Sequence, residues 1–165
     1  MLILGIDPGS TRVGYGLIKK QNNELKLITS GLLKILSKDK GLRLLEIETQ
    51  FLKLLKTQKP DLVVLEKLFF MKNLKTAMEV AQSRGVLTLI CVKHKISLLE
   101  LAPSEIKSAV AGHGQADKKS ISSMVSKILK VDEIKGPDDI TDAIAAAIAG
   151  SNNFYLKINN IKLEL

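Results

Sequence analysis

The sequence contains a single cysteine, Cys91, so no disulfide can form within one chain. Cys91 lies in the apolar run VLTLICV, which favours a buried structural thiol over a reactive one. Tryptophan is absent and aromatic residues make up 4% of the sequence, so Leu, Ile, Val and Ala must fill the core. A chain without disulfides is typical of a reducing compartment, and we therefore expect a cytoplasmic protein.

Long apolar runs are also missing. No stretch approaches the roughly 18 residues that a membrane span requires. The start, MLILGIDPGS, has no basic segment and soon meets a turn, so we expect neither a signal peptide nor a membrane partner, but a soluble protein. The 165 residues, 45% of them hydrophobic, predict one compact domain at residues 1–150, followed by a loosely held C-terminal tail at 151–165.

Charge is unevenly balanced. The net charge is +8, and lysine supplies nearly all of it, because Arg12, Arg43 and Arg84 are the only arginines. A basic excess favours a polyanionic partner, since each cation placed near a phosphate releases condensed counterions. A generally basic surface without such a partner explains the same charge equally well. Charge alone therefore decides nothing about function.

The pattern of apolar residues predicts strands and helices in one chain. Continuous or alternating apolar runs indicate strands, and apolar spacings of three and four indicate helices. We expect strands at 2–6, 13–18, 25–36, 62–65 and 97–101, and helices at 42–55, about 73–92, 103–111, 117–129 and 139–149. Gly31 is expected to mark a bulge in the third strand, and Gly150 to end the last helix.

This order of elements predicts an α/β fold, with a mixed five-stranded sheet flanked by helices. The first three strands should form an antiparallel meander because their connections are short. The later strands alternate with helices, which predicts parallel crossover connections. The two strands with helices on both sides, 62–65 and 97–101, should then be central and buried.

Acidic residues stand at three meaningful points of this scheme. Asp7 ends the first strand, Glu66 ends the fourth, and Asp139 and Asp142 open the last helix, three apart on one face. Strand ends in open α/β sheets are where ligand sites gather. Each acid also has an ordinary interpretation, as a turn residue, an exposed ion-pair partner or a helix N-cap. Their combination in a basic chain is what indicates a site.

Four carboxylates of this kind are suited to a hard divalent cation. Mg²⁺ prefers oxygen ligands, and two such ions roughly 3.5–4 Å apart can activate water and stabilise the leaving oxygen in phosphodiester cleavage. Motifs of other chemistries are missing, because the sequence has no GxxxxGK[ST] loop, no GxSxG elbow and no CxxC. His94 and His113 are too few and too far apart to form a zinc site.

Five blocks follow one another along the chain: GIDPGSTRVGYGLI, LEKLFFMKN, AQSRGV, KSAVAGHGQADK and DDITDAIAAAIA. In order and spacing they resemble the RuvC family of bacterial crossover junction endodeoxyribonucleases, over about residues 3–150. The resemblance implies a ribonuclease H-like fold and a homodimer that resolves Holliday junctions, which are four-way DNA junctions, by paired symmetric nicks in DNA recombination and repair. It also implies Mg²⁺ as cofactor, two ions per site, with Mn²⁺ as a substitute, and RuvA and RuvB as partners.

The resemblance places the catalytic, metal-binding carboxylates of the family at Asp7, Glu66, Asp139 and Asp142. The third of these has an alternative, because Asp138 lies four residues before Asp142 and also opens the helix. The family pattern of two acids three apart before an alanine selects Asp139.

The resemblance also implies DNA-binding residues. The base-contacting aromatic falls on Phe69, with Phe70 beside it as the alternative. An aromatic in a loop is more often a core anchor, but an unstacked base of a junction offers it a stacking partner. The basic DNA contacts fall on Lys107 and Lys118, with Lys119 adjacent. His113 receives no role.

Two other functions and one structural question stay open. The chain could be another ribonuclease H-like nuclease, acting on RNA hybrids or flaps, or a non-catalytic junction-binding protein. The blocks around Phe69 and residues 107–118 argue against the first, and the complete set of carboxylates argues against the second. Ala77, Ala81 and Gly85 recur every four residues, which suits either packing on the sheet or close approach of a second copy.

Overall fold

The computed structural model describes the backbone at residues 1–67 and 74–158, and side chains at residues 1–67 and 77–152. Ten elements follow the predicted order. The strands are β1 (Leu2–Asp7), β2 (Arg12–Gln21), β3 (Glu24–Lys34), β4 (Leu62–Glu66) and β5 (Ser97–Leu101), and the helices are α1 (Lys40–Gln58), α2 (Leu74–Lys93), α3 (Pro103–Ala111), α4 (Lys118–Leu129) and α5 (Asp138–Ile158).

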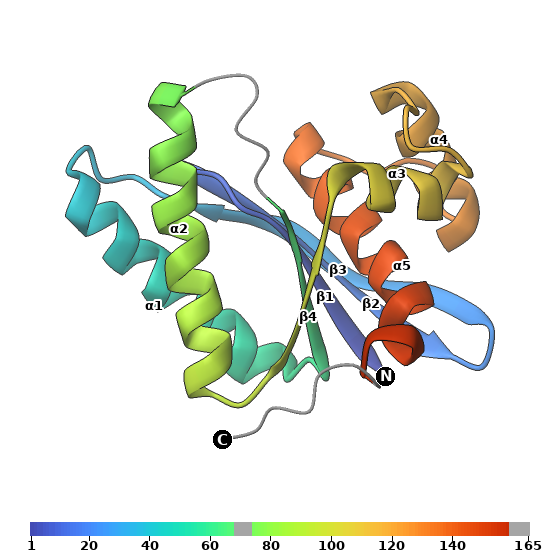
Figure 1. Cartoon of the computed structure of the whole chain (residues 1–165), viewed down its shortest axis with the longest axis horizontal. Coiled ribbons are helices and arrows are strands. Elements are labelled where there is room, and N and C mark those ends of the chain that lie inside the picture. Colours follow the sequence, from blue (N-terminus) through green and yellow to red (C-terminus); the bar gives the residue numbers. More distant parts are fainter. Residues whose placement is uncertain (68–73, 159–165) are drawn as a thin grey trace.

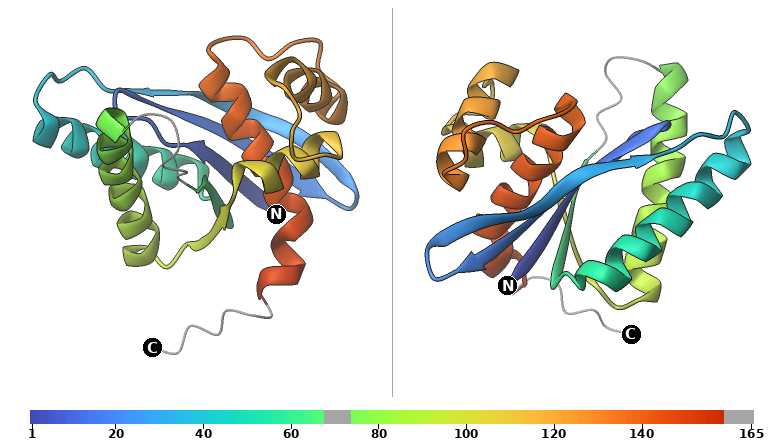
Figure 2. Two further views of the ribbon diagram at one scale, coloured as in Figure 1. Left: turned by 45° about the horizontal axis from the view of Figure 1, so that its top comes forward. Right: turned by 180° about the vertical axis from the view of Figure 1, so that it is seen from behind.

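The five strands form one mixed sheet in the order β3-β2-β1-β4-β5. The strands β1, β2 and β3 are antiparallel neighbours, whereas β4 pairs in parallel with β1, and β5 pairs in parallel with β4. The helices α1 and α2 cover one face of the sheet, and α3, α4 and α5 lie on the other (Figure 1). Seen from behind, the long β2–β3 hairpin runs diagonally in front of α5 (Figure 2, right). The predicted mixed five-stranded α/β fold is confirmed.

Helix α5 lies unusually close to the sheet because the strands beneath it carry glycine. A Cβ added at Gly5 would lie 1.9 Å from the backbone oxygen of Ala143, and one added at Gly14 would lie 2.0 Å from that of Asp139. The buried run Ala143–Ala149 matches this contact with small and aliphatic side chains. The close packing brings the first turn of α5 over the ends of β1 and β2.

Two expectations about glycines are wrong. Helix α5 continues past Gly150, where a Cβ would lie 2.4 Å from Cγ2 of Val64, so this glycine serves close packing and does not end the helix. The bulge in β3 falls at Ile28, because Leu17 pairs with Thr29 and the next residue of β2 pairs with Leu27. Gly31 stays in register and leaves room for the ring of Tyr15, whose hydroxyl would lie 2.8 Å from an added Cβ.

The expected position of β5 is also wrong. Its only sheet neighbour in the described residues is β4, so β5 is an edge strand and β1 takes the central place beside β4. The physical reason is that the antiparallel meander occupies one side of β1, which leaves the other side for β4. Cys91 is buried as predicted, and burial raises the pKa of its thiol to about 12. None of the helices, as far as the structure describes them, is long and apolar enough to span a membrane.

Candidate active site

Two carboxylates lie side by side at the ends of the central parallel strands. Ile6 of β1 pairs with Leu65 of β4, so the next residues, Asp7 and Glu66, occupy neighbouring strand ends. Side chains alternate along a strand, and Val64 faces the core under α5. Glu66 therefore points to the same face, towards α5. The sequence placed both acids at strand ends, and the topology brings the two ends together.

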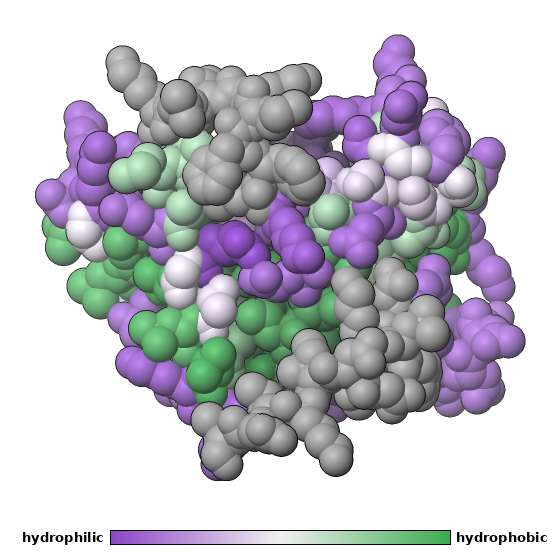
Figure 3. Space-filling model, in the orientation of Figure 1, coloured by the Kyte–Doolittle hydropathy of each residue, from purple (hydrophilic) through white to green (hydrophobic). Residues whose placement is uncertain are grey.

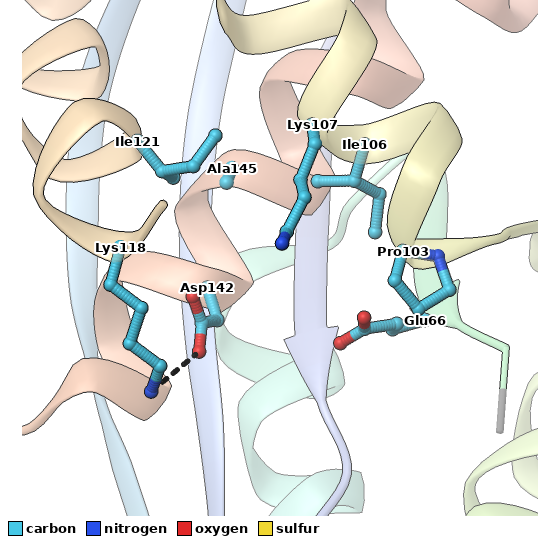
Figure 4. A pocket seen from close by; sticks show the side chains of 8 residues that line it. All are labelled: Glu66, Pro103, Ile106, Lys107, Lys118, Ile121, Asp142 and Ala145. Carbon is cyan, nitrogen blue, oxygen red and sulfur yellow. Dashed lines mark ion pairs between the residues drawn. The ribbon is translucent and has the colours of Figure 1, made fainter. Parts of the chain in front are cut away.

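Helix α5 adds a third carboxylate from above. Asp142 lies in its first turns, and together with Glu66, Lys107 and Lys118 it lines a cavity of about 210 Å³. In Figure 4, Lys107 extends from α3 into the space between Asp142 and Glu66. Apolar residues of α3, α4 and α5 complete the wall, which consists otherwise of Pro103, Ile106, Ile121 and Ala145.

The local sequence explains why α3 and α4 deliver their lysines here. The Glu105 side chain accepts a hydrogen bond from the Ala102 backbone N–H at 2.6 Å, which closes the first turn of α3. The Asp117 side chain accepts one from the Ser120 N–H at 2.7 Å and caps α4. Lys118 is therefore the first residue of α4, and it is set at the rim of the cavity.

The carboxylates repel one another in a poorly hydrated place. Burial, followed by the charges of Glu66, Asp142 and Asp139, raises the pKa of Asp7 from 3.8 to about 7. The pKa of Glu66 is raised by burial and then by the charge of Asp142, and burial is also the largest cause of the raised pKa of Asp142. Burial and neighbouring like charges cost folding free energy, and raised carboxyl pKa values with these causes are typical of functional sites.

Two cations compensate part of this charge. Nζ of Lys118 lies 2.9 Å from Oδ2 of Asp138. It lies 4.0 Å from Oδ2 of Asp142, and Figure 4 marks this second pair with a dashed line. The hydrogen bond to Asp138 is the main cause of the raised pKa of Lys118. Lys107 makes no such close pair among the described residues, but its charge lowers the pKa of Glu66 and of Asp142. The cavity thus combines acids with two lysines, of which Lys107 reaches into it and Lys118 lies at its rim.

The two acids that compete for the third position behave differently. Asp138 is exposed on 72% of its side chain and pairs with Lys118, whereas Asp139 is exposed on 21% and acts on the pKa of Asp7. The charge of Asp138 in turn raises the pKa of Asp142 more than the charge of Asp139 does. The partner of Asp139 is Arg12, a residue that the sequence analysis did not select. The only sequence signal for Arg12 was its position five residues after Asp7, and 127 positions along the chain separate it from Asp139.

The donor set suits a hard cation. Carboxylate oxygens are the ligands that Mg²⁺ prefers, and their mutual repulsion is relieved by a divalent charge between them. Among the described residues, no three Asp, Glu, His or Cys side chains already lie close enough together to hold a metal ion. Asp7, Glu66 and Asp142 are coupled through their charges, and Lys118 and Arg12 pair with acids of the same group.

The other residues predicted from the sequence do not line the cavity. Asp7 and Asp139 are absent from its wall, although their charges act on the same group of acids, and Lys119 is exposed on α4. His113, to which the sequence assigns no role, is exposed in the turn after α3. Phe69 and Phe70 lie outside the described residues.

Comparison with known proteins identifies the family. The sequence pattern of crossover junction endodeoxyribonuclease RuvC matches residues 3–150. The RuvC of Halothermothrix orenii is 42% identical over 94% of this chain and 95% of its own length, and that of Petrotoga mobilis is 42% identical over 92% and 94%. The chain belongs to the RuvC family. The resemblance read from the five sequence blocks is confirmed.

Solved RuvC structures share the fold. The structure of Thermus thermophilus RuvC superposes with a TM-score of 0.84 at 27% identity, over 94% of this chain and 96% of that one. The yeast mitochondrial Holliday junction resolvase shares the fold at a TM-score of 0.69 and 14% identity. The ribonuclease H-like architecture is therefore confirmed for this member of the RuvC family.

Proposed function

We propose that the chain is a metal-dependent endonuclease that resolves Holliday junctions by paired symmetric nicks, in DNA recombination and repair. The observation that carries this is the cavity that joins Glu66 and Asp142 to Lys107 and Lys118 at the strand ends. Its acids suit a cation and its lysines suit a phosphate, as phosphodiester cleavage requires. Membership of the RuvC family supplies the substrate class, and Thermus thermophilus RuvC, which has the same fold, is known in complex with a Holliday junction substrate.

In this proposal Asp7, Glu66, Asp139 and Asp142 hold the metal. Mg²⁺, at two ions per site and replaceable by Mn²⁺, supplies Lewis acidity to the scissile phosphate when it is bound. The protein's own part is positional. The β1 and β4 ends fix two carboxylates, and the close packing of α5 on Gly5 and Gly14 fixes the others above them.

The lysines bind the strand that is cut. Lys107 reaches into the cavity and Lys118 stands at its rim, so both can neutralise phosphates next to the cleaved bond. Lys119, exposed beside Lys118 on α4, extends this basic edge away from the cavity. Phe69 follows Glu66 by three residues, and we propose it as the aromatic that stacks on an unpaired base, with Phe70 as the alternative.

A substrate panel tests the function. The purified protein is incubated with synthetic four-way junctions, flaps, RNA–DNA hybrids and linear duplex, with Mg²⁺ or with a chelator, and the nicks are mapped on each strand. We expect symmetric nicks on the four-way junction alone, and none with the chelator. Preferential cutting of hybrids or flaps would support the general nuclease instead, and junction binding without any nicks would support the non-catalytic alternative.

The choice between Asp138 and Asp139 gives a second test. Asp139→Asn should lower junction nicking by about 10–100-fold or more, the range of losses around metal ligands. Asp138→Asn should leave nicking within a few-fold of the wild type, because its side chain is 72% exposed and its ion pair with Lys118 lies in solvent. Single-turnover nicking rates of the two variants decide the assignment, and the reverse order of effects would make Asp138 the ligand.

We also propose a homodimer. Met78, Leu89 and Val92 of α2 are exposed on 68%, 53% and 66% of their surface, at spacings that place them on one stripe. Gly85 lies within this stripe, and nothing lies within 4 Å of a Cβ added there. Ala77 is buried instead, so it packs inward. Figure 3 shows apolar side chains gathered over α1 and α2. A second copy would cover this face isologously, which matches the twofold symmetry of the junction.

Other assignments rest on family membership. We propose that the protein acts in the cytoplasm with RuvA and RuvB as partners. The division into a nuclease domain at 1–150 and a tail at 151–165 stays a prediction, and the continuation of α5 to Ile158 shows only that a helix crosses the boundary.

A further inference from the structure

Arg12 is the one basic residue in the described structure that pairs with Asp139. Its Nε lies 3.2 Å from Oδ1 and 3.1 Å from Oδ2 of this carboxylate, so both oxygens face the guanidinium. The pairing joins the first residue of β2 to the first turn of α5, across nearly the whole sequence. A contact between such distant segments is set by the fold and not by local chain geometry.

The strand pattern explains why Arg12 reaches this position. On β2, Gly14 lies beneath Asp139 and Gly16 beneath Ile144, so both face α5. Arg12 is two residues before Gly14 and belongs to the same face. It is therefore the first residue on this face of β2 to carry a side chain, and it lies at the end of this interior strand, close to the end of β1.

Only part of the guanidinium is used by Asp139. The side chain of Arg12 is 54% exposed, against 21% for Asp139, and the described contact to Asp139 involves Nε alone. A guanidinium presents five N–H donors in a planar fork that matches a phosphate as well as a carboxylate. Within the described part of the chain, the terminal nitrogens of Arg12 have no hydrogen-bond partner, so their N–H groups remain available beside a site proposed to cut a phosphodiester.

We propose that Arg12 is a positioning and DNA-binding residue that bridges Asp139 and a phosphate of the bound strand. Nε orients the carboxylate, and the terminal N–H groups bind the phosphate. The bridge keeps Asp139 in place when DNA arrives, and it adds a phosphate contact from β2 to those of Lys107 and Lys118, which come from α3 and α4. This inference rests on the proposed function of the site.

Two substitutions separate the two parts of the bridge. Arg12→Ala removes both the charge and the hold on Asp139. Arg12→Lys keeps a charge for the phosphate, but an ammonium cannot serve phosphate and carboxylate with one planar fork. Lys56→Ala is the matched control, because Lys56 is an exposed cation of α1 on the other face of the sheet.

The first measurement is junction binding without metal. The dissociation constant of a labelled four-way junction is followed against KCl concentration in a chelator, where no nicking occurs. Arg12→Ala should reduce the log–log slope by about 0.9, the contribution of one phosphate contact on duplex DNA. Arg12→Lys and Lys56→Ala should retain the wild-type slope.

The second measurement is the response to Mg²⁺. The Mg²⁺ concentration that gives half of the full rise in melting temperature should increase about 10-fold in both Arg12 variants, because partners of metal ligands change metal affinity by about 10–100-fold. Lys56→Ala should respond as the wild type does. Melting curves without metal show that each variant is folded.

The outcomes separate this inference from the function itself. An unchanged salt slope in Arg12→Ala, or an unchanged Mg²⁺ response in both Arg12 variants, contradicts the bridge. A wild-type protein that cuts no junction overturns the proposed function, whereas the salt slope still decides whether Arg12 touches DNA.

Discussion

Asp7→Asn is expected to abolish junction nicking and, at the same time, to raise the melting temperature of the metal-free protein. The asparagine keeps the size of the side chain but removes the charge that holds the metal, so nicking should fall by more than about 100-fold, the upper range for losses around metal ligands. The gain in stability comes first from the burial of the Asp7 carboxylate, which removes its hydration, and then from its repulsion by Glu66, Asp142 and Asp139. One substitution thus has opposite effects on activity and on stability.

The pH dependence of this gain has a definite sign. The pKa of Asp7 is about 7 in the folded protein and 3.8 in the reference state, so between these values the folded state holds more protons than the unfolded state. Stability of the metal-free wild type therefore falls as pH rises from about 4 to about 7. The gain from Asp7→Asn should be absent near pH 4 and complete above pH 7.

The size of the gain follows from the shift. The raised pKa of Asp7 corresponds to at most about 4 kcal/mol of folding free energy. An asparagine amide buried without hydrogen-bond partners costs about 1–3 kcal/mol, which offsets part of this gain. A rise in melting temperature of about 2–8 °C at pH 8 is expected. Added Mg²⁺ should raise the melting temperature of the wild type and leave that of Asp7→Asn nearly unchanged.

The control is Asp132→Asn, which removes an exposed acid that is not among the charges acting on Asp7. It should melt like the wild type at every pH and nick at the wild-type rate. If Asp7→Asn melted below the wild type at pH 8, or gained equally at pH 4 and pH 8, the carboxylates would not repel one another as the geometry indicates.

Local patterns in the sequence were sufficient to predict most elements and the positions of three acids that the fold brings together. Asp7 and Glu66 end apolar strands, and Asp142 opens a buried helix, so the order of elements already indicates that they meet. The ion pair of Arg12 with Asp139 was not predictable in this way. It depends on how close α5 comes to β2, which is set by glycines whose role emerges only in three dimensions.

The errors have a common physical origin. A glycine can end a helix, form a β-bulge or allow close packing against a neighbouring segment, and the local sequence does not distinguish these roles. Gly150 allows close packing of Val64, although the sequence pattern indicated a helix end there. Gly31 leaves room for the Tyr15 ring, although the sequence pattern indicated a bulge. The edge position of β5 was missed for a related reason, because pairing between strands is decided by the whole sheet and not by the residues of one strand.

Leu89→Glu is expected to convert a dimer into a monomer and to abolish paired nicking. Leu89 lies on the exposed stripe of α2, and it also lines a groove of about 220 Å³ between α1 and α2, together with Leu45 and Val86. A carboxylate placed at the centre of an apolar isologous interface would meet its own copy, so the substitution adds like-charge repulsion to the lost contact. The fold of one chain should persist, because Leu89 is 53% exposed within it.

Sedimentation and a plasmid that extrudes a cruciform provide the two readouts. Wild type should sediment at twice the 18.1 kDa mass of one chain, and Leu89→Glu at that mass. Two nicks within one binding event give linear plasmid, whereas separate single nicks give nicked circles. Leu89→Glu should therefore shift the product from linear to nicked circles and lower the overall rate.

Ile28→Glu is the matched control, because Ile28 is 45% exposed at the bulge of β3, away from α1 and α2. It should leave the mass of the protein and the plasmid product unchanged. A Leu89→Glu protein that stays dimeric, or that yields linear plasmid as a monomer, would show that the α2 stripe is not the face on which two copies act together.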